Sequence, residues 1–315
     1  MMKSENTLDN IRVDAAISKL FPDINLTRSK IQKMLEDGKI RVNSKPVKPS
    51  FKLKTGDIIE IDEIAEQNCP VLPEKIDLDI VYEDDFILLL NKQKGILTHP
   101  TPLNKTGTLV NALLYYANAS GCALSDIQGE ERRGIVHRLD KNTSGLILIA
   151  KTNEAHLNLQ QQIQTKAAKR KYLAVVHGVI EENEGIIDKP LAHFMNKTVK
   201  MNIAKKGEGL EAVTLYKVLE RYEDLTLVEL ELKTGRTHQI RCHMASINHP
   251  VYGDTLYGAK GFRSKINVKT TEQLLMSYYI NFTHPKTGDI MEFKLNENLY
   301  DEDFKRFFTA IKRSR

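Results

Sequence analysis

The hydrophobic pattern of the first sixty residues predicts two short helices followed by short strands. Apolar side chains recur at helical spacing over residues 11–21, and Pro22 ends this predicted helix. Thr27 is a suitable N-cap for a second helix, which Gly38 would end. Extended segments are predicted next, over residues 40–43 and 57–62 with a turn at 44–46. This pattern indicates a unit of about sixty residues, which is marginal alone and viable when tethered to a larger domain.

The remaining sequence alternates apolar strands with short helices. Residues 65–75 include Pro70 and Pro73 and show little periodicity, which predicts a linker. Beyond the linker we expect strands over 80–90, 145–150, 172–177 and 225–232, and helices over 111–118 and 153–166.

Two aromatic positions near the end of the chain complete this pattern. Phe282 and the region of Phe293 are predicted to close the sheet. Strands outnumber helices and many can join as hairpins, so we expect an α+β domain with a largely antiparallel mixed sheet. The predicted organisation is a small domain over residues 1–64, the linker, and a large domain over 76–315.

Composition excludes several classes of protein. No apolar run approaches the roughly 20 residues that a membrane span needs, and the N-terminus lacks the apolar stretch of a secretory signal. The three cysteines, Cys69, Cys122 and Cys242, are odd in number and far apart, which argues against a disulfide framework. We therefore expect a cytoplasmic protein that has no membrane partner. No segment is typical of a dedicated dimer face, so we expect a monomer.

The positive charge is concentrated in one stretch of the small domain. Between Thr27 and Lys54 there are nine basic residues and only two acidic ones, Glu36 and Asp37, whereas the net charge of the whole chain is only +5. A concentrated basic surface attracts phosphate chains through counterion release, although a charged stretch is more often only a solvated face. The charge alone leaves both interpretations open.

The segment 134–145 carries the first candidate chemistry. Arg138, Asp140 and Lys141 come directly before the predicted strand 145–150, on a loop rich in Asn, Thr, Ser and Gly. Loops at strand ends are where scaffolds display functional groups. The alternative is an ordinary turn in which Asp140 caps backbone amides.

Three further segments favour the functional interpretation. Residues 91–100 are basic and follow an apolar strand, residues 169–174 place three cations before Tyr172, and residues 234–243 turn from a strand into a predicted helix with Arg236 at its start. Cations, aromatics and one aspartate at strand ends suit an enzyme that holds a phosphate backbone and handles a base.

A metal site is the other chemistry that the sequence suggests. The candidate ligands, whose spacing matches no paired metal motif and which have no carboxylate among them, are His238, Cys242, His243 and His249. We therefore expect no metal.

The small domain resembles the alpha-L RNA-binding module through "RVDAAISKLF", "LTRSKIQKMLEDGKIRVNSKPVK" and "LKTGDIIEI". In that family the second helix and the loop after it face RNA. The resemblance therefore implies an RNA-facing set composed of Arg28, Ser29, Lys30, Lys33, Lys39, Arg41, Asn43 and Lys45.

The large domain resembles the RluA-type pseudouridine synthases. The strings that carry the resemblance are "NKQKGILTHP", "TLVNALLYY", "RRGIVHRLDKNTSGLILIAKT", "KRKYLAVVHG", "TGRTHQIRCHMASINHPVYGDTLYG" and "INFTHPKTGD", in the family's order over roughly residues 75–295. The resemblance implies a pseudouridine synthase fold and RNA as the substrate, in a reaction that needs no cofactor. The alpha-L module favours a large structured RNA, so ribosomal RNA is expected before transfer RNA.

The resemblance also implies roles for single residues. Asp140 would be the catalytic aspartate, Arg138 the arginine that displaces the target base, and Tyr172 an active-site tyrosine near that base. Arg236 would pair with the aspartate. One departure is Met276-Ser277, which stands where the family is expected to have His-Ala.

The implied reaction breaks the N1–C1′ bond of uridine, turns the base and joins C1′ to C5. One carboxylate can serve it, either by attacking C1′ or by stabilising positive charge there, and the sequence leaves both routes open. A non-catalytic RNA-binding factor for ribosome assembly is the alternative from another class. Its function would not require Asp140, Arg138, Tyr172 and Arg236 together.

Overall fold

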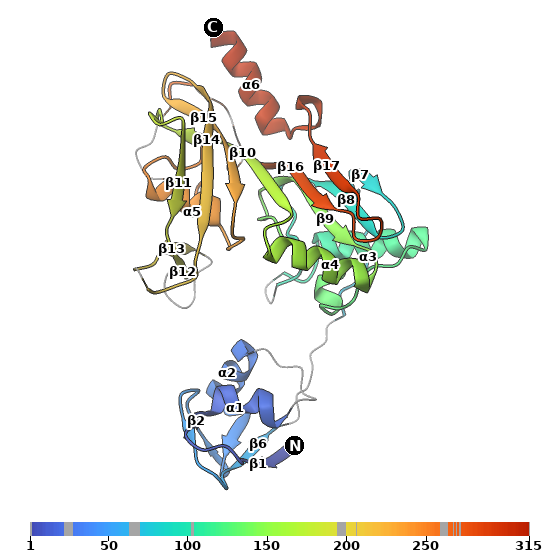
Figure 1. Cartoon of the computed structure of the whole chain (residues 1–315), viewed down its shortest axis with the longest axis vertical. Coiled ribbons are helices and arrows are strands. Elements are labelled where there is room, and N and C mark those ends of the chain that lie inside the picture. Colours follow the sequence, from blue (N-terminus) through green and yellow to red (C-terminus); the bar gives the residue numbers. More distant parts are fainter. Residues whose placement is uncertain are drawn as a thin grey trace. The chain divides into compact units, whose positions relative to one another are not determined.

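The computed structural model describes residues 2–21, 28–62, 70–101, 104–193, 200–205, 207–258, 264–266, 268, 270 and 272–314. The chain divides into two compact units, Met1–Cys69 and Pro70–Arg315 (Figure 1). Each unit has its own hydrophobic core and is considered separately. Among the described residues, no helix is both long enough and apolar enough to cross a membrane.

The N-terminal unit combines two helices with short antiparallel strands. The helices are α1 (Val13–Leu20) and α2 (Arg28–Glu36). One sheet has the order β1 (Met2–Glu5), β6 (Ile58–Ile61), β3 (Ile40–Val42), β4 (Lys45–Pro46), and β2 (Ile11–Arg12) pairs with β5 (Lys52–Leu53). The helices bury Val13, Ile17 and Ile31 against the sheet. The two helices and the strands at 40–43 and 57–62 are confirmed, and Gly38 adopts a positive φ of 71° just after α2. The predicted N-cap Thr27 and the helix stop Pro22 lie outside the described residues.

The C-terminal unit is built on a nine-stranded sheet with the order β11-β14-β15-β10-β16-β9-β8-β7, to which β17 is added on β16. The strands are β7 (Ile80–Glu83), β8 (Ile87–Lys92), β9 (Ser144–Ala150), β10 (Lys169–His177), β11 (Glu184–Asp188), β14 (Val213–Arg221), β15 (Leu225–Leu232), β16 (Leu275–Thr283) and β17 (Ile290–Lys294), with a separate pair β12 (Leu191–His193) and β13 (Met201–Ile203). All neighbouring strands are antiparallel except β9 and β16, which are parallel. The predicted α+β class and mixed, largely antiparallel sheet are confirmed.

Helices cover both faces of this sheet. They are α3 (Leu109–Ser120), α4 (Asn153–Gln164), α5 (Gln239–Ser246) and α6 (Glu302–Ser314). Helices α4 and α6 contribute to one buried cluster with Leu148 and Phe282. Helices α3 and α5 contribute to a second cluster with Ile147 and Tyr172. Adjacent residues of one strand enter different cores because strand side chains alternate between faces.

Three local predictions are corrected. Residues 80–90 form a hairpin rather than one strand, because the Asp84 carboxylate accepts hydrogen bonds from the amides of Phe86 (2.8 Å) and Ile87 (2.9 Å) and so closes a turn. Phe282 does not close the sheet, because its strand β16 has β10 on one side and β9 and β17 on the other, whereas Phe293 does lie on an added edge strand, β17. Part of the predicted linker is bound to α3, where Glu74 N donates to Asn111 O (3.0 Å) and Asn111 Nδ2 donates to Leu72 O (2.8 Å).

Gly145 allows the parallel strands β9 and β16 to meet. Its φ is +106°, which residues with a side chain rarely adopt. A Cβ added there would lie 2.0 Å from the carbonyl oxygen of Ser277, the residue that pairs with it on β16. The glycine therefore allows β9 to approach β16 closely. This contact joins the segment around Asp140 to the centre of the sheet.

We expect Gly145→Ala to lower the free energy of unfolding by about 3 kcal/mol or more, because the clash is with backbone that cannot rotate away. Urea denaturation followed by circular dichroism measures this. Gly121→Ala is the matched control, since Gly121 also has a positive φ (+72°) but nothing within 4 Å of the added Cβ. The control should cost only about 1 kcal/mol, and equal losses for the two variants would contradict the steric argument.

Candidate active site

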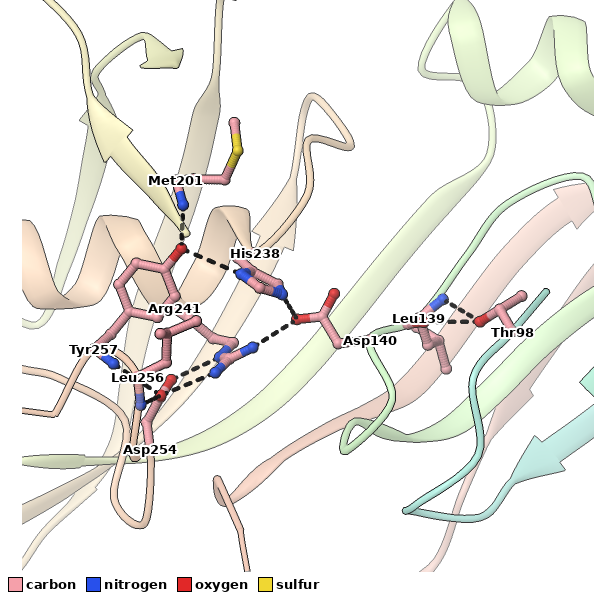
Figure 2. A network of polar contacts seen from close by, with 9 residues as sticks. All are labelled: Thr98, Leu139, Asp140, Met201, His238, Arg241, Asp254, Leu256 and Tyr257. Carbon is pink, nitrogen blue, oxygen red and sulfur yellow. Dashed lines mark hydrogen bonds and ion pairs between the residues drawn. The ribbon is translucent and has the colours of Figure 1, made fainter. Parts of the chain in front are cut away.

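The loop before β9 fixes Asp140 through its neighbour Leu139. The Thr98 hydroxyl donates to Leu139 O (2.7 Å) and accepts from Leu139 N (3.2 Å), so one buried side chain holds both backbone groups (Figure 2). Thr143 N donates to Asp140 O (3.1 Å) and closes the turn. The Asp140 carboxylate is left directed toward α5.

A single guanidinium joins Asp140 to a second aspartate. Arg241 Nη1 donates to Asp140 Oδ2 (3.3 Å). The other edge of the same group grips Asp254, with Nε to Oδ2 at 2.6 Å and Nη2 to Oδ1 at 2.9 Å (Figure 2). Such a two-point contact fixes the plane of the guanidinium as well as its position.

Asp254 is itself held by the turn that follows it. Its Oδ1 accepts from the amides of Leu256 (2.9 Å) and Tyr257 (3.0 Å). Burial alone would raise the pKa of Asp254, but its hydrogen bonds and the charge of Arg241 keep that pKa below its usual value. Burial opposes the charged form of Arg241 as well, yet Asp254 and Asp140 together raise its pKa. The three groups are therefore a stable chain of alternating charges.

His238 approaches the same oxygen of Asp140 from the other side. Its Nε2 lies 3.9 Å from Asp140 Oδ2, and its Nδ1 lies 3.2 Å from the Tyr257 hydroxyl (Figure 2). That hydroxyl accepts from Met201 N (2.7 Å), so its own hydrogen can be donated to Nδ1. Burial lowers the pKa of His238, which favours the neutral ring. The remaining ring hydrogen then sits on Nε2, which faces Asp140.

Two cavities meet at Asp140. A small one of about 50 Å³ has Asp140, Tyr172, Arg241 and Leu275 in its walls, and a larger one of about 500 Å³ also includes Asp140 and Tyr172. Arg138 lies in the walls of both cavities.

Tyr172 is only 4 % exposed, and burial raises the pKa of its phenol, which keeps the hydroxyl protonated. Its partner on the neighbouring strand β16 is Ser277, whose hydroxyl donates to Leu146 O (3.1 Å). At the departure Met276-Ser277, both residues are buried, so this wall of the site is closely packed.

The structure corrects the partner assigned to Asp140. Among the described residues, the ion pairs of Asp140 are with Arg241 and His238, and not with Arg236. Arg236 lies in the turn before α5, where its Nε donates to Glu211 O (2.9 Å) while its side chain borders both cavities. Arg241 lies inside the helix and faces inward. The pairing predicted for Arg236 is therefore wrong, although Arg236 remains at the site.

Sequence reasoning missed Arg241, Asp254 and Tyr257. The string that contains Arg236 also contains Arg241, and helical spacing places Arg241 three residues after His238, on the same side of the helix start. That spacing could have identified Arg241. No comparable signal exists for Asp254, whose partner lies on a different element.

Lys92 is a further buried cation that the sequence did not single out. It is 3 % exposed, and its ammonium group donates to three carbonyl oxygens, of Gln93 (2.9 Å), Ile96 (3.0 Å) and Lys141 (3.2 Å). Burial lowers the pKa of Lys92 to about 7, against the opposing effect of the Asp140 carboxylate. Lys92 thus ties the residue after Asp140 to the turn that follows β8.

The four residues considered as metal ligands have structural contacts instead. His243 bonds Thr214 Oγ1 and Lys189 O (both 2.9 Å), and His249 bonds His177 O (2.8 Å). Cys242 donates to Met201 O (3.5 Å), and His238 contacts Tyr257. Among the described residues, no group of three metal-ligating side chains is assembled.

The structure separates the predicted RNA-facing residues of the N-terminal unit into groups. Arg41 is engaged internally, with Nη1 donating to Asp62 Oδ2 (3.0 Å), and Asn43 donates to Asp57 Oδ1 (2.8 Å). Three lysines are exposed: Lys33, Lys39 and Lys45. The structure does not describe the side chains of Arg28, Ser29 and Lys30, at the start of α2.

Fold and site together define an α+β protein that holds one clamped carboxylate in the walls of two cavities and carries a separate small module with exposed lysines. Comparison with known families agrees. Residues 86–246 match the RNA pseudouridylate synthase family, and residues 11–59 match the S4 domain, which is the alpha-L module.

Individual relatives are similar over most of the chain. An uncharacterized RNA pseudouridine synthase of Bacillus subtilis, YlyB, is 41% identical over 268 residues, covering 85% of this chain and 85% of that protein. Ribosomal large subunit pseudouridine synthase D of Neisseria meningitidis is 41% identical over 290 residues, covering 90% of this chain and 75% of that protein.

Among solved structures, Human RNA Pseudouridylate Synthase Domain Containing 4 has a TM-score of 0.57 at 19% identity, covering 74% of this chain and 93% of that one, which is a likeness of fold. The chain therefore belongs to the RNA pseudouridine synthase family. It is an RluA-type enzyme that isomerises uridine to pseudouridine in RNA.

We expect Asp254→Asn to lower kcat roughly tenfold to a hundredfold with little change in KM. A small displacement of Arg241 would misplace Asp140, and misplacements near 1 Å can cost about a hundredfold. Tritium release from labelled RNA measures both constants. Asp84→Asn is the matched control, since Asp84 also caps a turn and pairs with a basic side chain, His284, at the opposite end of β8 and β9. Equal losses of kcat in the two variants would mean that stability alone is affected.

The lowered pKa of Lys92 predicts that the free energy of unfolding depends on pH. Its folded pKa of about 7 is below the usual value of 10.5, so between these values the unfolded chain binds the extra proton. The free energy of unfolding of the wild type should therefore rise, relative to Lys92→Met, as pH increases from about 7 toward 10, and the difference should be constant below pH 7. Urea denaturation at several pH values tests this, and parallel curves for the two proteins would contradict it.

Proposed function

We propose that this chain isomerises uridines of large-subunit ribosomal RNA, with Asp140 acting at C1′ of a uridine turned out of its stack. Transfer RNA is the second candidate substrate. The names of several relatives, ribosomal large subunit pseudouridine synthase D among them, support the ribosomal assignment. The S4 domain supports it too, because such a module suits a large structured RNA.

One observation carries the role of Asp140. It is the carboxylate at which the two cavities meet, and Arg241 and His238 hold one of its oxygens. The second oxygen is left to face the substrate, either as a nucleophile at C1′ or as the negative charge that stabilises a cation there. Both routes use the same geometry.

The remaining site residues follow from their positions. Arg138 is exposed and lines both cavities, so it can fill the space that the base leaves and offset part of the few kcal/mol that unstacking costs. Tyr172, buried and protonated, packs beside the uracil ring and can donate a hydrogen bond. Arg236 lines both cavities and would bind substrate there rather than orient Asp140.

The N-terminal unit would bind RNA through its exposed lysines. Lys33, Lys39 and Lys45 are the described members of the predicted set with exposed side chains that make no internal ion pair. Arg28, Ser29 and Lys30 remain predictions, as does a supporting role for Arg41 and Asn43. We propose that the enzyme acts in the cytoplasm as a monomer and without a cofactor.

The first test is pseudouridine mapping of cellular RNA from cells that carry the wild-type protein, Asp140→Asn or no protein. Sites made by the wild type should disappear with Asp140→Asn, and their location would name the substrate. Asp289→Asn is the control, because Asp289 is an exposed carboxylate outside both cavities. Sites that persist with Asp140→Asn would remove this residue from the chemistry, and sites only in transfer RNA would overturn the ribosomal assignment.

A further inference from the structure

A buried arginine lies beside the active site and has no role in the account above. Arg170 stands two residues before Tyr172 on β10, so both side chains point to the same face of the sheet. Arg170 is 7 % exposed and, with Tyr172 and Asp140, lines the cavity of about 500 Å³. Its guanidinium lies against the turn that carries Arg236, because a Cβ added at Gly235 would be 3.7 Å from Arg170 Nη2.

Arg170 lacks the partner that a buried cation requires. Its Nε has no hydrogen-bond partner, and no described carboxylate lies within ion-pair distance of its guanidinium. Taking a charge out of water without pairing it costs several kcal/mol, so buried cations are normally paired. Arg241, equally buried, meets this requirement twice, through Asp140 and Asp254.

The cavity around Arg170 carries a surplus of positive charge. Five of its lining side chains are cations and two are carboxylates: Arg138, Lys166, Arg170, Lys233 and Arg236 against Asp140 and Glu211. Asp140 is already held by Arg241 and Lys233 by Glu231, which leaves Arg138, Lys166, Arg170 and Arg236 against Glu211. Burial and then the charge of Arg170 lower the pKa of the adjacent His137 to about 3, so this ring stays neutral.

We infer that Arg170 anchors one phosphate group of the RNA strand, at a phosphodiester next to the uridine on which Asp140 acts. This inference rests on the proposed function of Asp140. A guanidinium matches phosphate oxygens through two parallel hydrogen bonds, and a phosphodiester supplies the one negative charge that the group lacks. The cavity wall that Arg170 shares with Tyr172 places this anion beside the target nucleotide. Substrate binding thus completes an ion pair that the free protein leaves open.

The test compares full-length wild type with Arg170→Gln and Arg170→Lys, using deproteinised ribosomal RNA as the probe. For Arg170→Gln we expect KM to rise about tenfold to a hundredfold and kcat to change less than about threefold. The slope of log affinity against log salt concentration should fall by about one. Arg170→Lys should recover part of the affinity, since it restores the charge without the planar fork.

Lys171→Gln is the matched control. Lys171 is the next residue of β10, carries the same charge and points to the other face, where its Nζ pairs with Glu229 Oε1 at 3.0 Å. We expect its KM and salt dependence to stay close to those of the wild type. Equal changes in the two glutamine variants would overturn the inference, because they would reflect overall charge.

Thermal unfolding without RNA separates binding from a structural role. Since the free protein holds Arg170 unpaired, Arg170→Met should raise the melting temperature by a few degrees. A lower melting temperature, an unchanged KM, or a loss of kcat at constant KM would each overturn the inference. If the wild type formed no pseudouridine in this RNA, the proposed function would fail, whereas the salt dependence of RNA binding would still decide the role of Arg170.

Discussion

The candidate active site depends on one guanidinium that two carboxylates share. Arg241 is fixed by Asp254, and Asp254 is fixed by two backbone amides, so the position of Asp140 is set by a turn more than a hundred residues further along the chain. Burying three charges is tolerable only because each one has its partners in good geometry. Removing any member leaves an unpaired charge in a place that water reaches poorly. The geometry of the candidate site and the packing of α5 against the sheet are therefore held by the same contacts.

The sequence predicted most of the fold because the elements follow local rules. Apolar periodicity located the helices and the strands at 145–150 and 225–232, and glycine and proline marked their ends. These local rules failed where contacts between distant segments determine the structure. The hairpin within 80–90 depends on Asp84 capping a turn inside an apolar run, and the central place of β16 depends on a glycine that admits a close parallel neighbour.

The candidate site was likewise predicted only where its residues lie together on one local segment. A dense local string identified Asp140 and its neighbours, because those residues sit on one loop. The choice between Arg236 and Arg241 required knowing which arginine lies inside a helix and which side of that helix faces the sheet. Asp254, Tyr257 and Arg170 were out of reach, because their importance lies in contacts, or in the lack of a contact, between segments far apart in the chain.

The order of strands in the sheet has a consequence for how the enzyme is made. Strand β16, residues 275–283, inserts between β9 and β10, although those two strands are synthesised more than a hundred residues earlier. The contacts within the N-terminal unit, by contrast, close within the first seventy residues. During translation the small RNA-binding unit can fold early, whereas the catalytic sheet must wait until its central strand has emerged from the ribosome. A nascent chain could therefore acquire affinity for RNA well before it acquires activity.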